Sequence, residues 1–364
     1  MDRGGAETLI MNVYRNMDRR KVQFDFVTHS TEKGDFEDEI LELGGRIFKI
    51  SSLGQLGPFL YLKELINIMK SNHFSAVHSH TDYQSGFPAL AAKLCGIKNR
   101  ICHSHSTYWQ RGDSSSERIT LNFLRSIIRI AATEYCSCSK EAAQFLFGKK
   151  VVDKEKVRIL NNGIIPGHFI RDFKIDRKSI IRELGLPDDS KIVGHVGRFS
   201  DSKNHSFLLK VMKKLIEQDN RFNALLIGDG PIRGQIEHEA LKLGIYDHIK
   251  FLGVRTDIAR LMNAFDVFLF PSKFEGFGIV TVEAQCSGTP CVISDTVPNI
   301  TDMGLGLVSY LSLDANIDSW CSKVSEVLII EKPDQEKIME EVTNRGYNIQ
   351  NNVNDWVSLY GLAT

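Results

Sequence analysis

The sequence predicts an α/β protein of two domains, each built on a doubly wound parallel sheet. Its 364 residues exceed what one hydrophobic core usually supports. Short apolar runs typical of buried parallel strands alternate with helical patterns along the chain. The alternation starts again beyond a linker near residues 166–173. We therefore expect an N-terminal domain at residues 1–165 and a C-terminal domain at residues 166–346.

The first half opens on a glycine turn and continues as alternating strands and helices. Gly4-Gly5 precedes apolar residues at helical spacing, as in a turn whose backbone faces phosphate. Such a turn normally follows a strand, and none precedes this one in the sequence. Strands are expected at 24–29, 47–50, 76–81, 99–106, 132–139 and 157–164, and helices after residue 5, at 35–45, 60–74 and 86–97, and on both sides of 132–139.

Four histidines lie at or near the ends of two of these strands. Strand alternation places His78 and His80 on one face, and likewise His103 and His105. Imidazoles so placed could contact a ligand at the carboxyl ends of the strands. A zinc site is the alternative, but no cysteine or acidic residue completes a ligand spacing. No metal site is therefore predicted.

The second half repeats the strand and helix pattern. Strands are expected at 192–197, 223–228, 249–255, 266–271, 291–294 and 304–311, and helices at 176–185, after 203, 256–265, 279–288, 315–330, 334–346 and 352–363. One strand ends in Gly230 within a GDGP turn. This turn is not GxGxxG, so no dinucleotide fingerprint is present.

The richest motif is the turn Glu275-Gly276-Phe277-Gly278, between a strand and a helix. Strand, glycine turn and helix aim backbone N–H groups and the positive end of a helix at one spot. Glu283 follows Glu275 by eight residues, a little over two helical turns, and can share its face. Two carboxylates beside an anion site suit a ligand with phosphate and hydroxyl groups, such as a sugar nucleotide.

A pair of cations flanks an earlier strand-to-helix loop. Arg198 follows Gly197 directly, and Lys203 opens the next helix. Two fixed cations at such a loop can neutralise a departing diphosphate without Mg²⁺.

These motifs resemble the retaining GT-B glycosyltransferases of family GT4. The Glu275-GFGIVTV-Glu283 segment is similar to the family's Glu, seven residues, Glu signature, and Gly197-Arg198 with Lys203 to its G-R-x4-K motif. The resemblance implies two Rossmann-like domains facing each other across a cleft. It also implies that residues 347–364 cross back to complete the N-terminal domain, and that a first strand of that domain is missing here.

The resemblance further implies the residues that contact the donor. Glu275 lies by the sugar hydroxyls, Glu283 holds the ribose, and Lys203 with Arg198 binds the diphosphate. His105 is the histidine that aligns best with the one facing the reacting sugar, so Glu275, Arg198, Lys203 and His105 are the expected catalytic residues. The other expected donor-binding residues are Gly4, Gly5, Gly197, Gly230, Val254, Phe277, Gly278, Ile279, Val280 and Glu283.

The implied reaction is retaining, metal-independent hexosyl transfer (EC 2.4) that needs no cofactor. The donor is a UDP-sugar or another nucleotide-diphosphate sugar. The acceptor is a saccharide or a polyprenyl-linked saccharide, as in capsular or exopolysaccharide synthesis. Two alternatives remain open: a GT-B sugar-nucleotide epimerase or phosphorylase, and a non-catalytic two-lobed sugar-binding protein.

Composition limits the partners. The formal net charge is zero, which argues against a general nucleic-acid binder. The seven cysteines lack paired spacing, as in a reduced cytoplasmic protein, and no apolar run is long enough to span a bilayer. Residues 118–130 are basic and apolar, typical either of a helix packed on a sheet or of one touching an anionic membrane. We expect a cytoplasmic protein that can contact the inner face of the plasma membrane.

Overall fold

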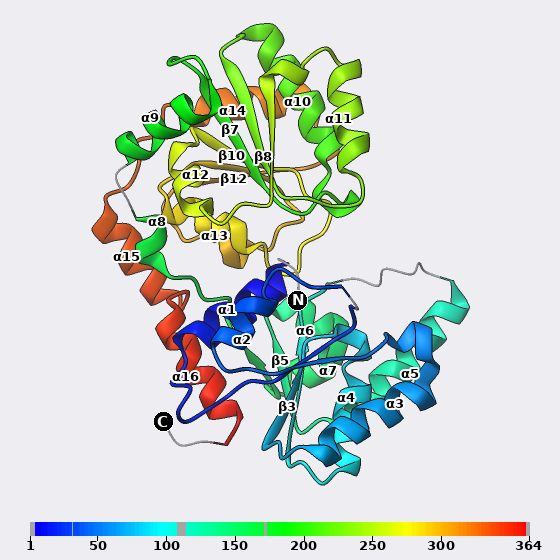
Figure 1. The fold of residues 1–364 in the computed structure, drawn as a ribbon. Helices are drawn as coiled ribbons and strands as arrows, with labels where there is room; N and C mark the ends of the chain where they lie inside the picture. Colours follow the sequence, from blue (N-terminus) through cyan, green and yellow to red (C-terminus); the bar gives the residue numbers. More distant parts are fainter. Residues whose placement is uncertain (1–3, 31, 108–113, 171–172, 362–364) are drawn as a thin grey trace. The chain divides into compact units, whose positions relative to one another are not determined.

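The computed structural model describes residues 4–30, 32–107, 114–170 and 173–361, which fold into two compact units (Figure 1). The first, here the N-unit, comprises Met1–Ile164 and Gly346–Thr364. The second, here the C-unit, comprises Ile165–Arg345. All seven cysteines are free thiols, and all but Cys95 are buried. Within the described ranges, no helix has the length and apolarity needed to cross a membrane.

The strands of the N-unit form two separate parallel sheets. One has four strands in the order β3 (Ala76–Ser79), β4 (Asn99–Ser104), β5 (Glu134–Ser137) and β6 (Val157–Ile159). The other contains only β1 (Phe26–Thr28) and β2 (Ile47–Lys49). Among the described residues, no strand joins β1 to β3, and the first element is a helix, α1 (Gly5–Asn16). The single sheet expected from the strand pattern is thus present as two parts.

Helices cover the larger sheet and tie the C-terminal segment to the N-unit. Helix α4 contacts α3 and α5 as well as strands β3 and β4, whereas α1 packs against α16 (Figure 1). Backbone hydrogen bonds join Ile164 to Tyr347 and to Ile349, at 2.8 and 2.9 Å. The helices are α2 (Glu37–Glu42), α3 (Leu53–Ser71), α4 (Gly86–Leu94), α5 (Ser115–Ala131), α6 (Lys140–Phe147), α7 (Lys149–Val152) and α16 (Ile349–Leu359), with the 3₁₀ turn η1 (Asp82–Gln84).

The C-unit contains one six-stranded parallel sheet in the order β12-β11-β10-β7-β8-β9. The chain winds outward from β7 to β9 and then returns to the other side of β7 to form β10. This reversal makes the sheet doubly wound, and ligands of such sheets bind where the strand order reverses, at the carboxyl ends. The strands are β7 (Lys191–Val196), β8 (Phe222–Ile227), β9 (Ile249–Gly253), β10 (Val267–Phe270), β11 (Cys291–Ser294) and β12 (Val308–Leu311).

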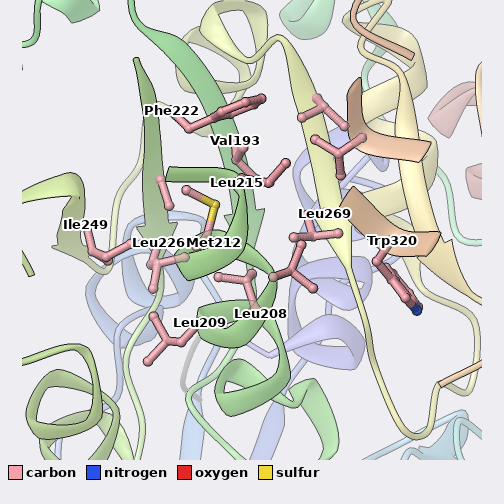
Figure 2. Close-up of a cluster of buried hydrophobic side chains, with 14 of the residues drawn as sticks. Val193, Leu208, Leu209, Met212, Leu215, Phe222, Leu226, Ile249, Leu269 and Trp320 are labelled. Atoms are coloured by element: carbon pink, nitrogen blue, oxygen red, sulfur yellow. The ribbon is translucent and has the colours of Figure 1, made fainter. Parts of the chain in front are cut away.

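A dense apolar core holds this sheet against its helices. Leu208, Met212 and Leu215 of α10 meet Leu226 of β8 and Leu269 of β10, all fully buried (Figure 2). Such packing keeps the carboxyl ends of β7, β8 and β10 in fixed register. The helices are α8 (Pro166–Phe169), α9 (Phe173–Leu184), α10 (His205–Gln218), α11 (Arg233–Lys242), α12 (Ile258–Ala264), α13 (Ile279–Cys286), α14 (Ile317–Val327) and α15 (Gln335–Asn344), with the 3₁₀ turns η2 (Asp201–Lys203), η3 (Tyr246–His248) and η4 (Asn299–Thr301).

Candidate functional site

The centre of the candidate site is an ion pair between Lys203 and Glu275. Lys203 closes η2 after β7, Glu275 follows β10, and these two strands are neighbours. The Lys203 ammonium contacts the Glu275 carboxylate and lies 4.8 Å from the centre of the Phe270 ring. The side chains are only 19% and 9% exposed. The structure therefore brings two of the four expected catalytic residues into contact at the reversal point of the sheet.

Ser272 links the two loops that carry this pair, and the sequence motifs did not single it out. Its buried hydroxyl lies 2.6 Å from the Glu275 Oε1 atom and 2.8 Å from the Ser202 carbonyl oxygen. The Lys273 amide donates to the same carbonyl at 2.7 Å. The signal in the sequence is its place, directly after the strand and three residues before Glu275. Ser272 thus fixes the carboxylate against the loop that bears Lys203.

The loop after β7 is fixed from its other side by the loop after β8. The amide of Gly197 donates to Ile227 and that of Phe199 to Asp229, both at 2.9 Å. A Cβ atom at Gly230 would lie 2.3 Å from the Phe199 carbonyl oxygen. Only glycine at position 230 permits this close approach, so Gly230 has a packing role independent of any contact with a base.

Arg198 is the free cation of this loop. Its side chain is exposed and makes no ion pair or hydrogen bond with any residue that the structure describes. Lys203, in contrast, is held by Glu275. An anionic ligand at the carboxyl end of β7 would thus meet one exposed cation and one that is already paired with a carboxylate.

Helix α13 presents the second carboxylate. Gly278 caps its amino end in the left-handed conformation, with φ of 85°, and Phe277 before it is buried. Ile279, Val280 and Glu283 are half-buried, and the Glu283 carboxylate has no hydrogen-bond partner among the described residues. Burial raises the pKa of Glu283 to about 7. A half-buried carboxylate lacking a protein partner is suited to a ligand's hydroxyl groups.

Val254 lies further out along the sheet, after β9. Its side chain is 49% exposed. The amide of Gly228 donates to the Gly253 carbonyl at 2.8 Å, which ties the end of β9 to the loop after β8. The expected donor-binding residues of the C-unit therefore follow β7, β8, β9 and β10, which are adjacent in the sheet.

The remaining expected residues belong to the N-unit. Gly4 caps α1 and Gly5 is its first residue. His105 follows β4, and its Nε2 atom lies 2.9 Å from Nδ1 of His80. Asp82, another residue that the sequence motifs did not indicate, accepts hydrogen bonds from the amides of His105 and Ser106 at 2.6 and 3.1 Å. Asp82 has a φ of 48°, which is unusual for a residue other than glycine and fixes the turn opposite His105.

Substituting Gly278 tests how much its left-handed conformation and its contact with Val297 contribute to stability. Gly278→Ala should lower the free energy of unfolding by about 1–2 kcal/mol, because an L-residue is strained there and its Cβ would lie 3.1 Å from Val297 Cγ1. Gly306→Ala is a matched control, since Gly306 has a φ of 73° and no atom within 4 Å of the new Cβ. Urea titration measures both. An equal loss in the two variants would show that contact with Val297 contributes nothing.

Comparison with known families covers nearly the whole chain. Residues 3–167 match the family described as Glycosyltransferase Family 4. Residues 176–344 match the family described as Glycosyl transferases group 1. The expected family is therefore confirmed in both halves.

Several relatives match over most of their length. EpsF of Bacillus subtilis, named as a glycosyltransferase, is 43% identical over all of this chain and 95% of its own. CapH of Staphylococcus aureus, named as a capsular polysaccharide biosynthesis glycosyltransferase, is 25% identical over 90% of this chain and 88% of its own. An Escherichia coli protein named UDP-Gal:alpha-D-GlcNAc-diphosphoundecaprenol alpha-1,3-galactosyltransferase is 24% identical, covering 93% and 89%. These names do not favour an epimerase, a phosphorylase or a non-catalytic binding protein.

The fold is that of solved glycosyltransferase structures. Anabaena HepE in complex with UDP and glucose aligns with a TM-score of 0.77 over 99% of this chain and 96% of its own, at 19% identity. The GT-B fold predicted from the sequence is thus confirmed by its neighbours. Both family matches and the full-length identity to EpsF show that this chain belongs to glycosyltransferase family 4 and is a GT-B glycosyltransferase.

Proposed function

We propose that the protein transfers a hexosyl group from a UDP-sugar, with retention and without a metal ion, to a saccharide carried on a polyprenyl diphosphate. The observation that supports it most is the Lys203–Glu275 pair at the reversal point of the C-unit sheet, in a loop that also carries Arg198. HepE has been solved with UDP-glucose, and the E. coli relative is named for a UDP-galactose donor and an undecaprenyl diphosphate acceptor. The CapH name supports a place in polysaccharide biosynthesis.

In this proposal, catalysis depends mainly on the two cations that stabilise the leaving diphosphate. As the bond between the sugar and the diphosphate breaks, negative charge grows on the departing phosphate oxygens. Lys203 and Arg198 stabilise that charge in the transition state more than in the ground state, which lowers the barrier. Two cations of the protein can supply the charge that a Mg²⁺ ion supplies in other phosphate sites, so no metal is required.

The carboxylates orient the donor. Glu283 accepts hydrogen bonds from the two ribose hydroxyls, and Glu275 accepts one from the sugar. The amides at residues 277–280 lie at the amino end of α13, where they can donate to the sugar or to phosphate. Because Glu275 holds Lys203 in this structure, the diphosphate must share or take over the lysine when the donor binds.

In the N-unit, Gly4 and Gly5 would contribute backbone amides to the diphosphate, and His105 would hydrogen-bond the sugar near the anomeric carbon. The acceptor hydroxyl would attack on the face that the diphosphate leaves, and the leaving phosphate would take its proton. Attack on that face preserves the anomeric configuration, and the reaction needs no covalent enzyme intermediate.

Helix α5 supports contact with an anionic membrane, where a polyprenyl-linked acceptor resides. Leu121, Leu124 and Ile128 are buried, so one face of the helix packs on the N-unit. Three large apolar side chains on the same helix are exposed: Ile119 at 70%, Phe123 at 60% and Ile130 at 64%. The helix also exposes two basic side chains, Arg118 and Arg129. An exposed surface that is both apolar and basic fits the headgroup region of an anionic bilayer at the cytoplasmic face.

A transfer assay tests this proposal. UDP-glucose, UDP-galactose and UDP-N-acetylglucosamine are each incubated with GlcNAc-diphosphoundecaprenol in anionic or neutral vesicles, with and without EDTA. We expect one UDP-sugar to give an α-linked product by NMR, faster on anionic vesicles and at an unchanged rate in EDTA. A β-linked product would contradict retention, a loss of rate in EDTA would contradict metal independence, and equal rates on both vesicles would contradict the membrane contact. UDP-sugar conversion that needs no acceptor would contradict transfer itself.

A further inference from the structure

Four imidazole rings lie together on the N-unit sheet. His78 belongs to β3 and His103 to β4, and His80 and His105 directly follow these strands. The ring centres of the successive pairs lie 4.2 Å apart for His78 and His80, 5.0 Å for His80 and His103, and 4.2 Å for His103 and His105. Parallel pairing of β3 with β4 explains the grouping, because alternate residues of the two strands face the same side. Adjacent strands thus supply imidazoles to one place from segments 25 residues apart.

Three of these rings bring a possible ligand nitrogen close to one another. One ligand atom from each of His78, His80 and His103 lies within 4.8 Å of the other two. The Nε2 atom of His78 and the Nδ1 atom of His103 are 3.2 Å apart. Two imidazole nitrogens bound to one tetrahedral metal at 2.0–2.1 Å would be about 3.4 Å apart. To complete such a geometry, the His80 ligand nitrogen would also have to lie about 3.4 Å from the other two.

The hydrogen bonds of His78 and His103 indicate where their protons lie. Among the described residues, the Nε2 atom of His103 has no hydrogen-bond partner, and the residue is fully buried. If His78 donates from Nδ1 to Tyr360 Oη, 3.0 Å away, its Nε2 accepts from Nδ1–H of His103. A metal ion would replace this hydrogen bond by binding Nε2 of His78 and Nδ1 of His103, and the His103 proton would then lie on Nε2.

Two aromatic residues of the C-terminal segment contact these rings. Trp356 stacks on His80 at 5.3 Å and encloses the group, and Tyr360 holds the second nitrogen of His78, as outer partners of metal-bound histidines do.

We propose that His78, His80 and His103 form a binding site for one divalent transition-metal ion of the kind that imidazole prefers, such as Zn²⁺, Co²⁺, Ni²⁺ or Cu²⁺. The site belongs to the N-unit and shares no residue with the diphosphate-binding set of the C-unit. His80 also contacts the His105 ring through its Nδ1 atom.

Metal titration of the full-length protein without a histidine tag tests the proposal directly. Co²⁺ should bind with one equivalent per chain and give the intense visible absorption of a tetrahedral complex, and Zn²⁺ should displace it. Cu²⁺ should quench the fluorescence of Trp356, which stacks on His80. These readouts do not depend on activity or on the identity of the donor sugar. Wild-type protein that binds no equivalent of Co²⁺ or Zn²⁺ at micromolar concentration would overturn the proposal.

Variants then locate the bound metal. His103→Gln and His78→Gln should each weaken Co²⁺ binding by at least about tenfold. His73→Gln, on an exposed histidine outside the group, should bind as the wild type does. Trp356→Phe should retain Co²⁺ binding and lose the Cu²⁺-dependent quenching, which separates the site from any effect of folding. Binding that survives in both His78→Gln and His103→Gln would assign the metal to other residues and overturn the proposal.

Discussion

Replacing Lys203 with alanine should lower kcat by about 10²–10³-fold while changing KM for the donor much less. The lysine is one of two cations at the carboxyl end of β7, and in this structure its charge is balanced by Glu275. In the ground state the diphosphate competes with that carboxylate for the lysine, so the net gain in binding is small. As the leaving phosphate gains charge, its interaction with Lys203 strengthens. Removing the lysine therefore destabilises the transition state more than the bound ground state.

Steady-state kinetics with the donor found in the transfer assay measures this effect. Lys273→Ala is the matched control, because Lys273 lies in the neighbouring loop and pairs with the exposed Asp201 at 2.6 Å. It should retain nearly wild-type kcat. Removing Lys203 also leaves the buried Glu275 carboxylate without its cation, so the thermal stability of the variant must be checked alongside. Equal kcat values for Lys203→Ala and wild-type protein of intact fold would contradict a catalytic role.

The sequence predicts the C-unit site well because its chemistry lies in short segments. Glu275 and Glu283 are placed by one strand-turn-helix unit, and Arg198 and Lys203 by another. The alternation of strands and helices predicts parallel order, and the carboxyl ends of parallel strands lie on one edge of the sheet. What local spacing does not give is the contact between Lys203 and Glu275. That contact depends on β10 pairing with β7 rather than with β9, which is a long-range choice.

Other features depend wholly on tertiary structure. Ser272 gains its role from Ser202, a residue 70 positions earlier, and Asp82 from the amides of a turn that follows β4. No spacing rule connects them. The histidine group gives a similar lesson: the sequence places two histidines on the same face of each strand, but only the pairing of β3 with β4 brings all four together. The division of the N-unit strands into two sheets is likewise a matter of pairing that no local pattern indicates.

Glu283 should make nucleotide binding depend on pH near neutrality. Burial raises its pKa to about 7 in the folded protein, above the ordinary glutamate value of about 4.3. Ribose hydroxyls donate hydrogen bonds, and the ionised carboxylate accepts them more strongly than the protonated acid does. UDP affinity should therefore be full above pH 8 and fall about tenfold per pH unit as pH drops below 7. The same pKa shift changes the free energy of unfolding in the opposite direction. The raised pKa stabilises the folded state at low pH, and this stabilisation is lost as pH rises through about 7.

Calorimetric titration of UDP from pH 5.5 to 8.5 measures the dependence, and substitution assigns it. Charged hydrogen bonds contribute about 1.5–3 kcal/mol, so Glu283→Ala should weaken UDP binding about tenfold to hundredfold at pH 8. Glu283→Gln keeps the shape and one acceptor oxygen but cannot ionise, so its affinity should be lowered and should lose the part of the pH dependence that Glu283 causes. The terminal phosphate of UDP, with a pKa of about 6, titrates equally in both experiments. Glu217→Gln, on an exposed glutamate of α10, should keep the wild-type curve. If Glu283→Gln retains the wild-type pH dependence, another group controls it, and Glu283 does not bind the ribose as an ionised carboxylate.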